Sequence, residues 1–149
     1  MTVKVGINGF GRIGRCTLSH ISQSLRNDIE VVKVNATGPL ATAAHLIKYD
    51  SVHGRYPHEI TVGNRTLDLG RGEIEMFSTY NMDELDWSGC DVVMECTGNF
   101  NDGHKAKKHI ERGAKRVLLS APGKNVDKTV VFGVNDELMA ANDTMISNG

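Results

Sequence analysis

A glycine-rich turn near the start of the chain constrains the fold more than any other feature. Residues 9–14 (GFGRIG) follow a strand-like segment at residues 3–8 and open a helical pattern that runs to about residue 25. In a G-x-G-x-x-G turn of this kind, Gly9 allows a tight turn, Gly11 lets the backbone approach a pyrophosphate, and Gly14 lets the helix pack closely on the strand. The helix N-terminus then offers free N–H groups to phosphates. The pattern predicts a dinucleotide site, with an ordinary strand–helix corner as the alternative.

Strands and helices alternate along the rest of the chain. Residues 28–35 form a predicted strand, and residues 39–47 a helix with Pro39 in its first turn. Short, half-polar segments with turn signals between them then suggest small antiparallel strands, at residues 59–62, 65–69 and 73–77. Further strands are predicted at residues 91–95, 115–120, 129–132 and 144–147, and helices at residues 102–112 and 136–140. We therefore predict an α/β, Rossmann-type, doubly wound fold: a mainly parallel sheet with helices on both faces and small inserted antiparallel strands.

Composition excludes several classes of function. The 149 residues are enough for one domain, and their net charge of −1 gives no electrostatic reason to bind nucleic acid or membrane. The apolar runs are too short to span a bilayer, and the first residues do not resemble a signal peptide. The three cysteines include no C-x-x-C pair. We expect a single dinucleotide-binding domain over residues 1–149, no metal site, and a reducing cytoplasmic compartment.

The tip of the second strand bears on the choice of cofactor. A dinucleotide site usually has an acidic residue there that binds the adenosine ribose, but this chain has Asn35, Ala36 and Thr37. Ala36 does not repel a 2′-phosphate, and Thr37 can donate a hydrogen bond, so we expect NADP to be tolerated or preferred. Alternatively, Ala36 only weakens ribose binding and NAD remains the cofactor. No arginine follows directly, and Lys33 is more simply a solvated strand lysine.

Several long motifs in a fixed order resemble one family of enzymes along the whole chain. They are residues 5–15 (VGINGFGRIGR), 45–51 (HLIKYDS), 53–56 (HGRY), 95–100 (ECTGNF), 120–124 (SAPGK), 133–135 (GVN) and 146–148 (ISN). They resemble the first part of the phosphorylating glyceraldehyde-3-phosphate dehydrogenases. Two positions depart from the family pattern. Ala36 replaces the usual Asp, as in gluconeogenic, NADP-using members, and Tyr80 replaces the Arg of an E-R-D-P segment. Tyr80 could stack on adenine or be an exposed loop aromatic.

The resemblance implies a set of cofactor contacts. The loop residues would hold the phosphates, Thr97 and Gly98 would lie along the adenosine, and Ser120 and Ala121 would lie beneath the ribose and nicotinamide. The hydroxyls of Thr97 and Ser120 could instead only cap a strand or turn. With the second-strand tip included, the candidate cofactor-binding residues are Asn8, Gly9, Phe10, Gly11, Arg12, Ile13, Asn35, Ala36, Thr37, Thr97, Gly98, Ser120 and Ala121.

The resemblance places the catalytic residues outside this chain. The family's nucleophilic cysteine sits in an S-C-T-T-N-C segment that would directly follow Gly149, and its catalytic histidine and phosphate-binding arginine would lie further on. Cys16 lies inside the first predicted helix, Cys90 precedes a strand and Cys96 lies at a strand end. All three are interpreted as structural, because the sequence shows no arrangement that would activate their thiols. We therefore assign no catalytic residue and expect the chain alone to be inactive.

For the full-length protein the resemblance implies oxidation and phosphorylation of glyceraldehyde 3-phosphate, in glycolysis or gluconeogenesis. A cysteine thiolate would add to the aldehyde, hydride would pass to the nicotinamide, and phosphate would cleave the thioester. Erythrose 4-phosphate is an alternative substrate. The intact protein is expected to be a homotetramer. A second alternative is a chain that folds or assembles but binds cofactor poorly, and exposed apolar surface could make it self-associate.

Overall fold

A single large sheet carries the glycine-rich turn at its centre. The computed structural model describes all residues, Met1–Gly149. The strands of this sheet are β1 (Val3–Asn8), β2 (Ile29–Asn35), β5 (Thr61–Val62), β6 (Thr66–Asp68), β7 (Glu73–Phe77), β8 (Val92–Glu95), β9 (Arg116–Leu119), β10 (Lys128–Val130) and β11 (Met145–Asn148). The helices are α1 (Arg12–Gln23), α2 (Leu40–Lys48) and α3 (Gly103–Glu111), with 3-10 turns η1 (Met82–Glu84) and η2 (Asp136–Leu138). A separate hairpin pairs β3 (Tyr49–Asp50) with β4 (Gly54–Arg55).

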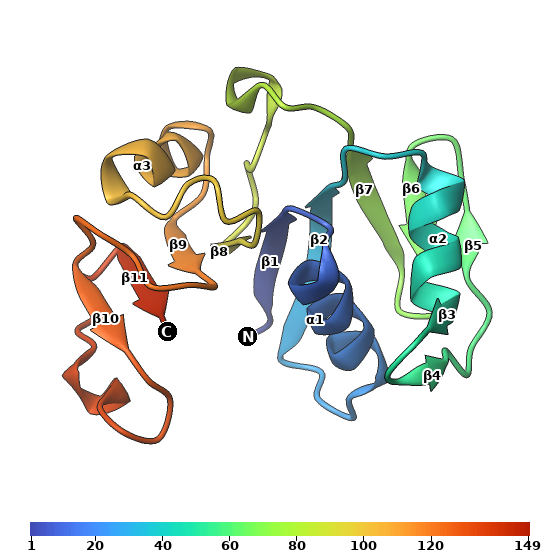
Figure 1. Cartoon of the computed structure of the whole chain (residues 1–149), viewed down its shortest axis with the longest axis horizontal. Helices are drawn as coiled ribbons and strands as arrows, with labels where there is room; N and C mark the ends of the chain where they lie inside the picture. Colours follow the sequence, from blue (N-terminus) through green and yellow to red (C-terminus); the bar gives the residue numbers. More distant parts are fainter.

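The strand order confirms the doubly wound fold. It is β10-β11-β9-β8-β1-β2-β7-β6-β5, as Figure 1 shows. From β1 the chain builds outward through β2 to β7, and then returns to add β8 on the other side of β1. All pairings from β10 to β7 are parallel. The order therefore reverses between β1 and β8, the position at which open α/β sheets bind ligands beyond the carboxyl ends of their strands.

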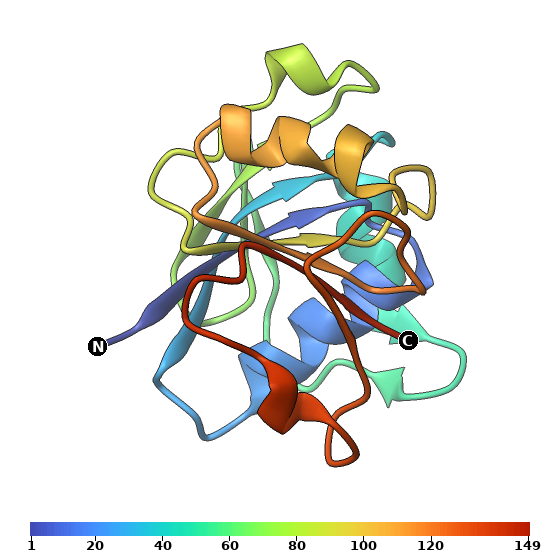
Figure 2. The same ribbon diagram turned by 90° about the vertical axis from the view of Figure 1, so that its left-hand side faces the viewer.

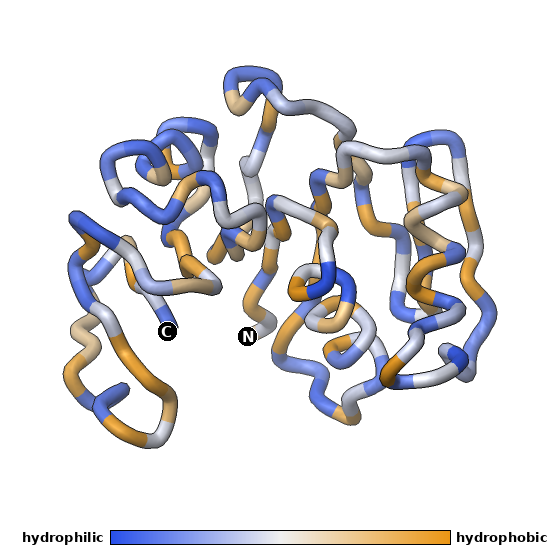
Figure 3. Tube along the Cα trace, viewed as in Figure 1, coloured by the Kyte–Doolittle hydropathy of each residue, from blue (hydrophilic) through white to orange (hydrophobic).

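Helices cover both faces of the sheet. Figure 2 shows α3 on one face and α1 on the opposite face. The largest apolar cluster has thirteen buried residues, and Ile7, Leu18 and Val34 at its centre are at most 1% exposed. Figure 3 shows the apolar character of the central strands, and of the loop that follows β10. Burial of alternate apolar residues is what fixes the register of such strands. No helix of the structure has the length and apolar character needed to cross a membrane.

Two predicted elements need correction, and one element was not predicted. β7 does not belong only to an antiparallel insertion, because it pairs parallel with β2 and antiparallel with β6, and so joins the insertion to the main sheet. The short helix predicted over residues 136–140 is a single 3-10 turn over residues 136–138, since the segment is too short to bury an amphipathic face. The β3–β4 hairpin was not predicted, because two-residue strands leave no periodic pattern.

The third glycine of the turn is required by packing. A Cβ atom on Gly14 would lie 2.1 Å from the carbonyl oxygen of Gly9 and 3.2 Å from Ile7 Cγ2. Helix α1 therefore rests directly on the turn that leaves β1, as the motif predicts. A side chain at this position would push the helix away from the strand.

We predict that Gly14→Ala lowers the free energy of unfolding by about 1–3 kcal/mol, the usual cost of overpacking. Gly38→Ala is the matched control, because a Cβ there meets nothing within 4 Å, and it should change stability by about 0.5 kcal/mol or less. Urea unfolding followed by fluorescence of Trp87, the one tryptophan and fully buried, measures both. Equal midpoints for the two variants would contradict the packing role of Gly14.

Candidate functional site

A cleft lies across the carboxyl ends of β1, β2 and β8. Its volume is about 280 Å³, and apolar and polar groups both line it. The lining residues are Asn8, Gly9, Phe10, Gly11, Asn35, Thr37, Thr79, Tyr80, Met82, Leu85, Cys96, Thr97, Asn99 and Phe100. The cleft therefore sits at the topological switch point, with the glycine-rich turn as its floor.

The turn is shaped for close approach of an anion. Gly9 has φ +96°, and a Cβ there would lie 2.7 Å from the backbone nitrogen of Thr97, so only glycine fits between the ends of β1 and β8. A Cβ on Gly11 would meet nothing within 4 Å and would project into open space. No side chain caps α1, its first turn has no acidic residue, and the N–H groups of Arg12 and Ile13 have no acceptor. Such free donors at a helix start suit a phosphate group.

Beneath the turn, two buried asparagines tie three strands together. Asn8 is 1% exposed and donates through Nδ2 to Glu95 Oε2 at 2.7 Å. Its Oδ1 accepts from Asn35 Nδ2 at 2.8 Å, and Asn35 also bonds the backbone of Thr79 in both directions. The side chains of Asn8 and Asn35 are therefore hydrogen-bonded to one another, and they position the ends of β1, β2 and β8 at the wall of the cleft.

The network continues to a fully buried carboxylate. Glu95 and His109 are both 0% exposed, and His109 Nε2 lies 2.8 Å from Glu95 Oε2. Trp87 Nε1 donates to His109 Nδ1 at 2.9 Å. An indole N–H can only donate, so His109 Nδ1 must accept and its proton sits on Nε2, facing the carboxylate. His109 therefore links the single tryptophan to the glycine-rich turn through Glu95 and Asn8.

Glu95 stays ionised in this position. Burial alone opposes its charge, but hydrogen bonds from His109, Thr97 and Asn8 outweigh that effect and hold the pKa of Glu95 below its ordinary value of 4.5. Thr97 contributes its backbone N–H at 2.7 Å and its hydroxyl to Glu95 Oε1. The Thr97 hydroxyl donates to Glu95 and accepts from the Asn99 N–H at 3.0 Å, while the residue itself lines the cleft.

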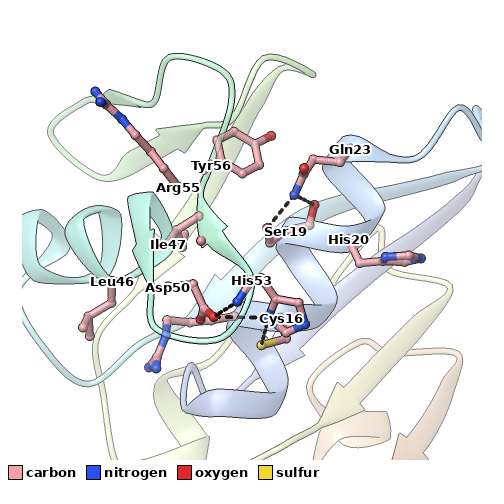
Figure 4. Close-up of a pocket in the computed structure, with 12 residues that line it drawn as sticks. Cys16, Ser19, His20, Gln23, Leu46, Ile47, Asp50, His53, Arg55 and Tyr56 are labelled. Carbon is pink, nitrogen blue, oxygen red and sulfur yellow. Dashed lines mark hydrogen bonds and ion pairs between the residues drawn. The ribbon is translucent and has the colours of Figure 1, made fainter.

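A second polar cluster ties α1 to the β3–β4 hairpin. The guanidinium of Arg12 pairs with Asp50, and Asp50 also lies 3.2 Å from His53 Nδ1. Cys16 Sγ is 3.9 Å from the same His53 nitrogen, and Figure 4 shows Cys16, Asp50 and His53 converging beside a hollow of about 270 Å³. Cysteine, aspartate and histidine can together hold a metal. Here Arg12 already supplies the positive charge, and it lowers the pKa of Asp50, so the cluster is explained as an ion-pair network.

The structure brings together most of the predicted site residues. Asn8, Gly9, Phe10, Gly11, Asn35, Thr37 and Thr97 line the cleft. Ala36 lines a neighbouring hollow instead. Arg12 and Ile13 form the first turn of α1, where the Arg12 guanidinium turns to Asp50 and Ile13 is 52% exposed. Gly98 follows Thr97 with φ +76°, and Ser120 and Ala121 follow β9 further along the carboxyl edge, outside the cleft lining.

Other cleft residues were not predicted from the sequence. Thr79, Met82 and Leu85 come from the segment after β7, and Asn99 and Phe100 from the loop after β8. Their position in the sequence could have indicated them, because both segments directly follow strands that end at the carboxyl edge of the sheet. Tyr80 also lines the cleft, and it is 86% exposed.

Neither Cys90 nor Cys96 has the surroundings of a nucleophile. Burial raises the pKa of Cys90 to about 11 and raises that of Cys96 as well. Both thiols therefore stay protonated at neutral pH. All three cysteines are free.

The fold and the cleft together define a dinucleotide-binding domain of the doubly wound class. Residues 3–103 match the family model described as glyceraldehyde 3-phosphate dehydrogenase, NAD binding domain. The chain therefore belongs to this family of NAD-binding domains.

Similar proteins cover the whole chain. It is 51% identical to glyceraldehyde-3-phosphate dehydrogenases of Cereibacter sphaeroides and Xanthobacter flavus, and 46% identical to glyceraldehyde-3-phosphate dehydrogenase 2 of Bacillus subtilis. Each alignment covers 99% of this chain but only 44–45% of the relative. The chain thus spans less than half the length of these curated relatives.

We predict that Glu95→Gln lowers the free energy of unfolding at pH 7 by about 1–3 kcal/mol, because an amide nitrogen would face a donor that the carboxylate now satisfies. The pKa of Glu95 is depressed in the folded state, so its stabilisation is present above about pH 4.5 and is lost as pH falls through the folded pKa. The gap between wild type and variant should therefore narrow below about pH 4.5.

Urea unfolding at pH 7 and pH 4 measures this gap. Glu137→Gln is the control, because Glu137 is exposed and makes no hydrogen bond or ion pair. A gap for Glu95→Gln that is the same at both pH values would show that the charge of Glu95 contributes nothing.

Proposed function

We propose that this chain is the NAD(P)-binding half of an enzyme that oxidises and phosphorylates glyceraldehyde 3-phosphate. One observation carries the proposal: free N–H groups at the start of α1 face open space above Gly11, at the switch point between β1 and β8. This is the arrangement that a dinucleotide pyrophosphate requires. The names of the relatives favour glyceraldehyde 3-phosphate over erythrose 4-phosphate as the substrate.

The residues of this chain would bind and orient the nucleotide, and they would not take part in the reaction themselves. The bound nucleotide supplies a hydride acceptor, and the chain sets its position through the turn, the second-strand tip and the segment after β8. The thiols of Cys90 and Cys96 are held protonated and cannot replace an activated nucleophile. We assign residues 1–149 to the dinucleotide-binding domain, which alone is inactive, and the chemistry to residues that this chain does not contain.

Assembly and compartment are part of the proposal. Exposed apolar side chains gather around β10 and η2, where Phe132 is 84% exposed, Val134 72% and Leu138 57%. A patch of this kind suits contact with the rest of a larger protein, and it gives the isolated chain a surface for self-association. Three free cysteines suit a reducing cytoplasm. We propose a homotetramer for the intact enzyme, acting in glycolysis or gluconeogenesis.

We also propose that the site accepts NADP. Ala36 puts no carboxylate at the tip of β2, so a 2′-phosphate meets no negative charge there. Family membership supports NAD as a cofactor.

The direct test is parallel titration of the chain with NAD and NADP by calorimetry. The proposal predicts saturable binding of at least one nucleotide. If neither nucleotide binds, the turn is only a strand–helix corner and the proposal is wrong.

We predict that Gly11→Ala weakens binding of both nucleotides by about tenfold or more, equivalent to about 1.4 kcal/mol. The new methyl group occupies the space above the turn but touches no protein atom, so the melting temperature should change little. Unchanged affinity would place the pyrophosphate elsewhere.

We predict that Ala36→Asp lowers NADP affinity relative to NAD by about tenfold or more, because a carboxylate repels the 2′-phosphate and binds the ribose hydroxyls of NAD. Ala36→Asn is the matched control, with nearly the same size and no charge. If Asp and Asn change the ratio of the two affinities equally, charge at this position does not select the cofactor.

A further inference from the structure

A second hollow lies across the tip of β2 from the nucleotide cleft. Its volume is about 300 Å³, and it is lined by Ala36, Gly38, Leu40, Asn64, Arg65 and Ser78, among others. Thr37, between Ala36 and Gly38, lines the nucleotide cleft instead. The two spaces therefore meet at the residues where the adenosine ribose of a dinucleotide is held.

Arg65 is the one charged residue in the lining of this hollow. The fold brings it there from 29 residues beyond Ala36, on the turn that joins β5 to β6. Its backbone carbonyl accepts from Met76 N–H at 2.9 Å, which fixes the turn against β7. The guanidinium of Arg65 itself makes no hydrogen bond and no ion pair.

Other charges near the tip are already neutralised. Lys33, the basic residue nearest to Ala36 in sequence, pairs with Asp86 at 3.0 Å and with Glu75 at 3.7 Å, and its side chain is only 13% exposed. It is not free to meet a ligand. No acidic side chain lines the hollow, so an anion there would meet Arg65 without a competing negative charge.

The start of α2 adds a second attraction for an anion. Leu40 is the first residue of this nine-residue helix and lines the hollow. No side chain caps the helix, its first turn has no acidic residue, and the N–H groups of Leu40, Ala41 and Thr42 have no acceptor. The helix dipole therefore presents its positive end to the same space as Arg65.

We propose that this hollow is the 2′-phosphate subsite for NADP, with Arg65 as the residue that selects NADP over NAD. The inference rests on the proposed nucleotide site. A nucleotide lying over Thr37 would direct its 2′-substituent across the β2 tip, where a phosphate meets the Arg65 guanidinium, the Ser78 hydroxyl and the start of α2. A ribose without the 2′-phosphate makes no contact with Arg65, so the affinity for NAD does not depend on this residue.

The test compares Arg65→Gln with wild type in titrations with 2′,5′-ADP, 5′-AMP, NADP and NAD. We expect Arg65→Gln to lower the affinities for 2′,5′-ADP and NADP by about 10- to 100-fold, the usual effect of losing a charge-assisted hydrogen bond. Binding of 5′-AMP and NAD should stay within about twofold of wild type. Arg65→Lys should restore part of the loss, because a point charge replaces a planar one.

Lys128→Gln is the matched control for the loss of one positive charge. Lys128 is exposed on β10, at the opposite edge of the sheet, and should leave all four affinities unchanged. In wild type, raising the salt concentration should weaken the binding of NADP more than the binding of NAD. In Arg65→Gln, it should weaken the binding of both nucleotides equally.

The outcomes separate this inference from the proposed function. If wild type binds NAD but Arg65→Gln leaves NADP unchanged, or weakens NAD and NADP equally, the subsite is wrong while the nucleotide cleft stands. Inorganic phosphate should compete more strongly with 2′,5′-ADP than with 5′-AMP. Equal competition with both would also overturn the subsite, because phosphate would then bind outside this hollow. Failure of wild type to bind any nucleotide would overturn both proposals.

Discussion

The close contact between the ends of β1 and β8 organises this protein. Gly9 turns with a positive φ where the backbone of Thr97 leaves no room for a Cβ, and the same turn carries α1 packed against it through Gly14. The strand order reverses at this point, so the loops after β1 and β8 diverge and open the cleft. Because the N-terminus of α1 has no cap of its own, the contact that builds the fold also leaves donors free for a ligand.

The buried network below this contact explains how the cleft keeps its shape. Glu95 links β8 to β1 through Asn8, to α3 through His109, and to the segment after β8 through Thr97. A buried carboxylate is costly unless its lone pairs are satisfied, and four donors satisfy this one. Removing any one of these hydrogen-bond donors would leave the buried charge of Glu95 incompletely hydrogen-bonded. The polar groups therefore hold the strand ends in one arrangement, while apolar packing supplies most of the stability.

Local sequence signals predicted the parts that depend on neighbouring residues. The glycine turn, the strand–helix alternation and the strand ends follow from periodicity and turn chemistry, and the structure confirms them. Contacts between distant residues left no such signal. Arg12 appears as a loop residue but pairs with Asp50, Lys33 is held by Asp86, and Arg65 reaches the β2 tip through an antiparallel insertion. No sequence pattern around His109 indicates its hydrogen bond to Glu95. These pairings depend on topology, which the sequence pattern gives only in outline.

The proposed site puts a dinucleotide on the turn at the β1–β8 switch point. Amide hydrogen exchange of the chain, with and without saturating NADP or NAD, tests it most directly. We expect slower exchange for the amides of residues 11–14, at the start of α1, and of residues 97–98, after β8. Exchange at the hollow beside Cys16 and His53 should not change. Protection confined to that hollow, or binding without protection at residues 11–14, would contradict the claim.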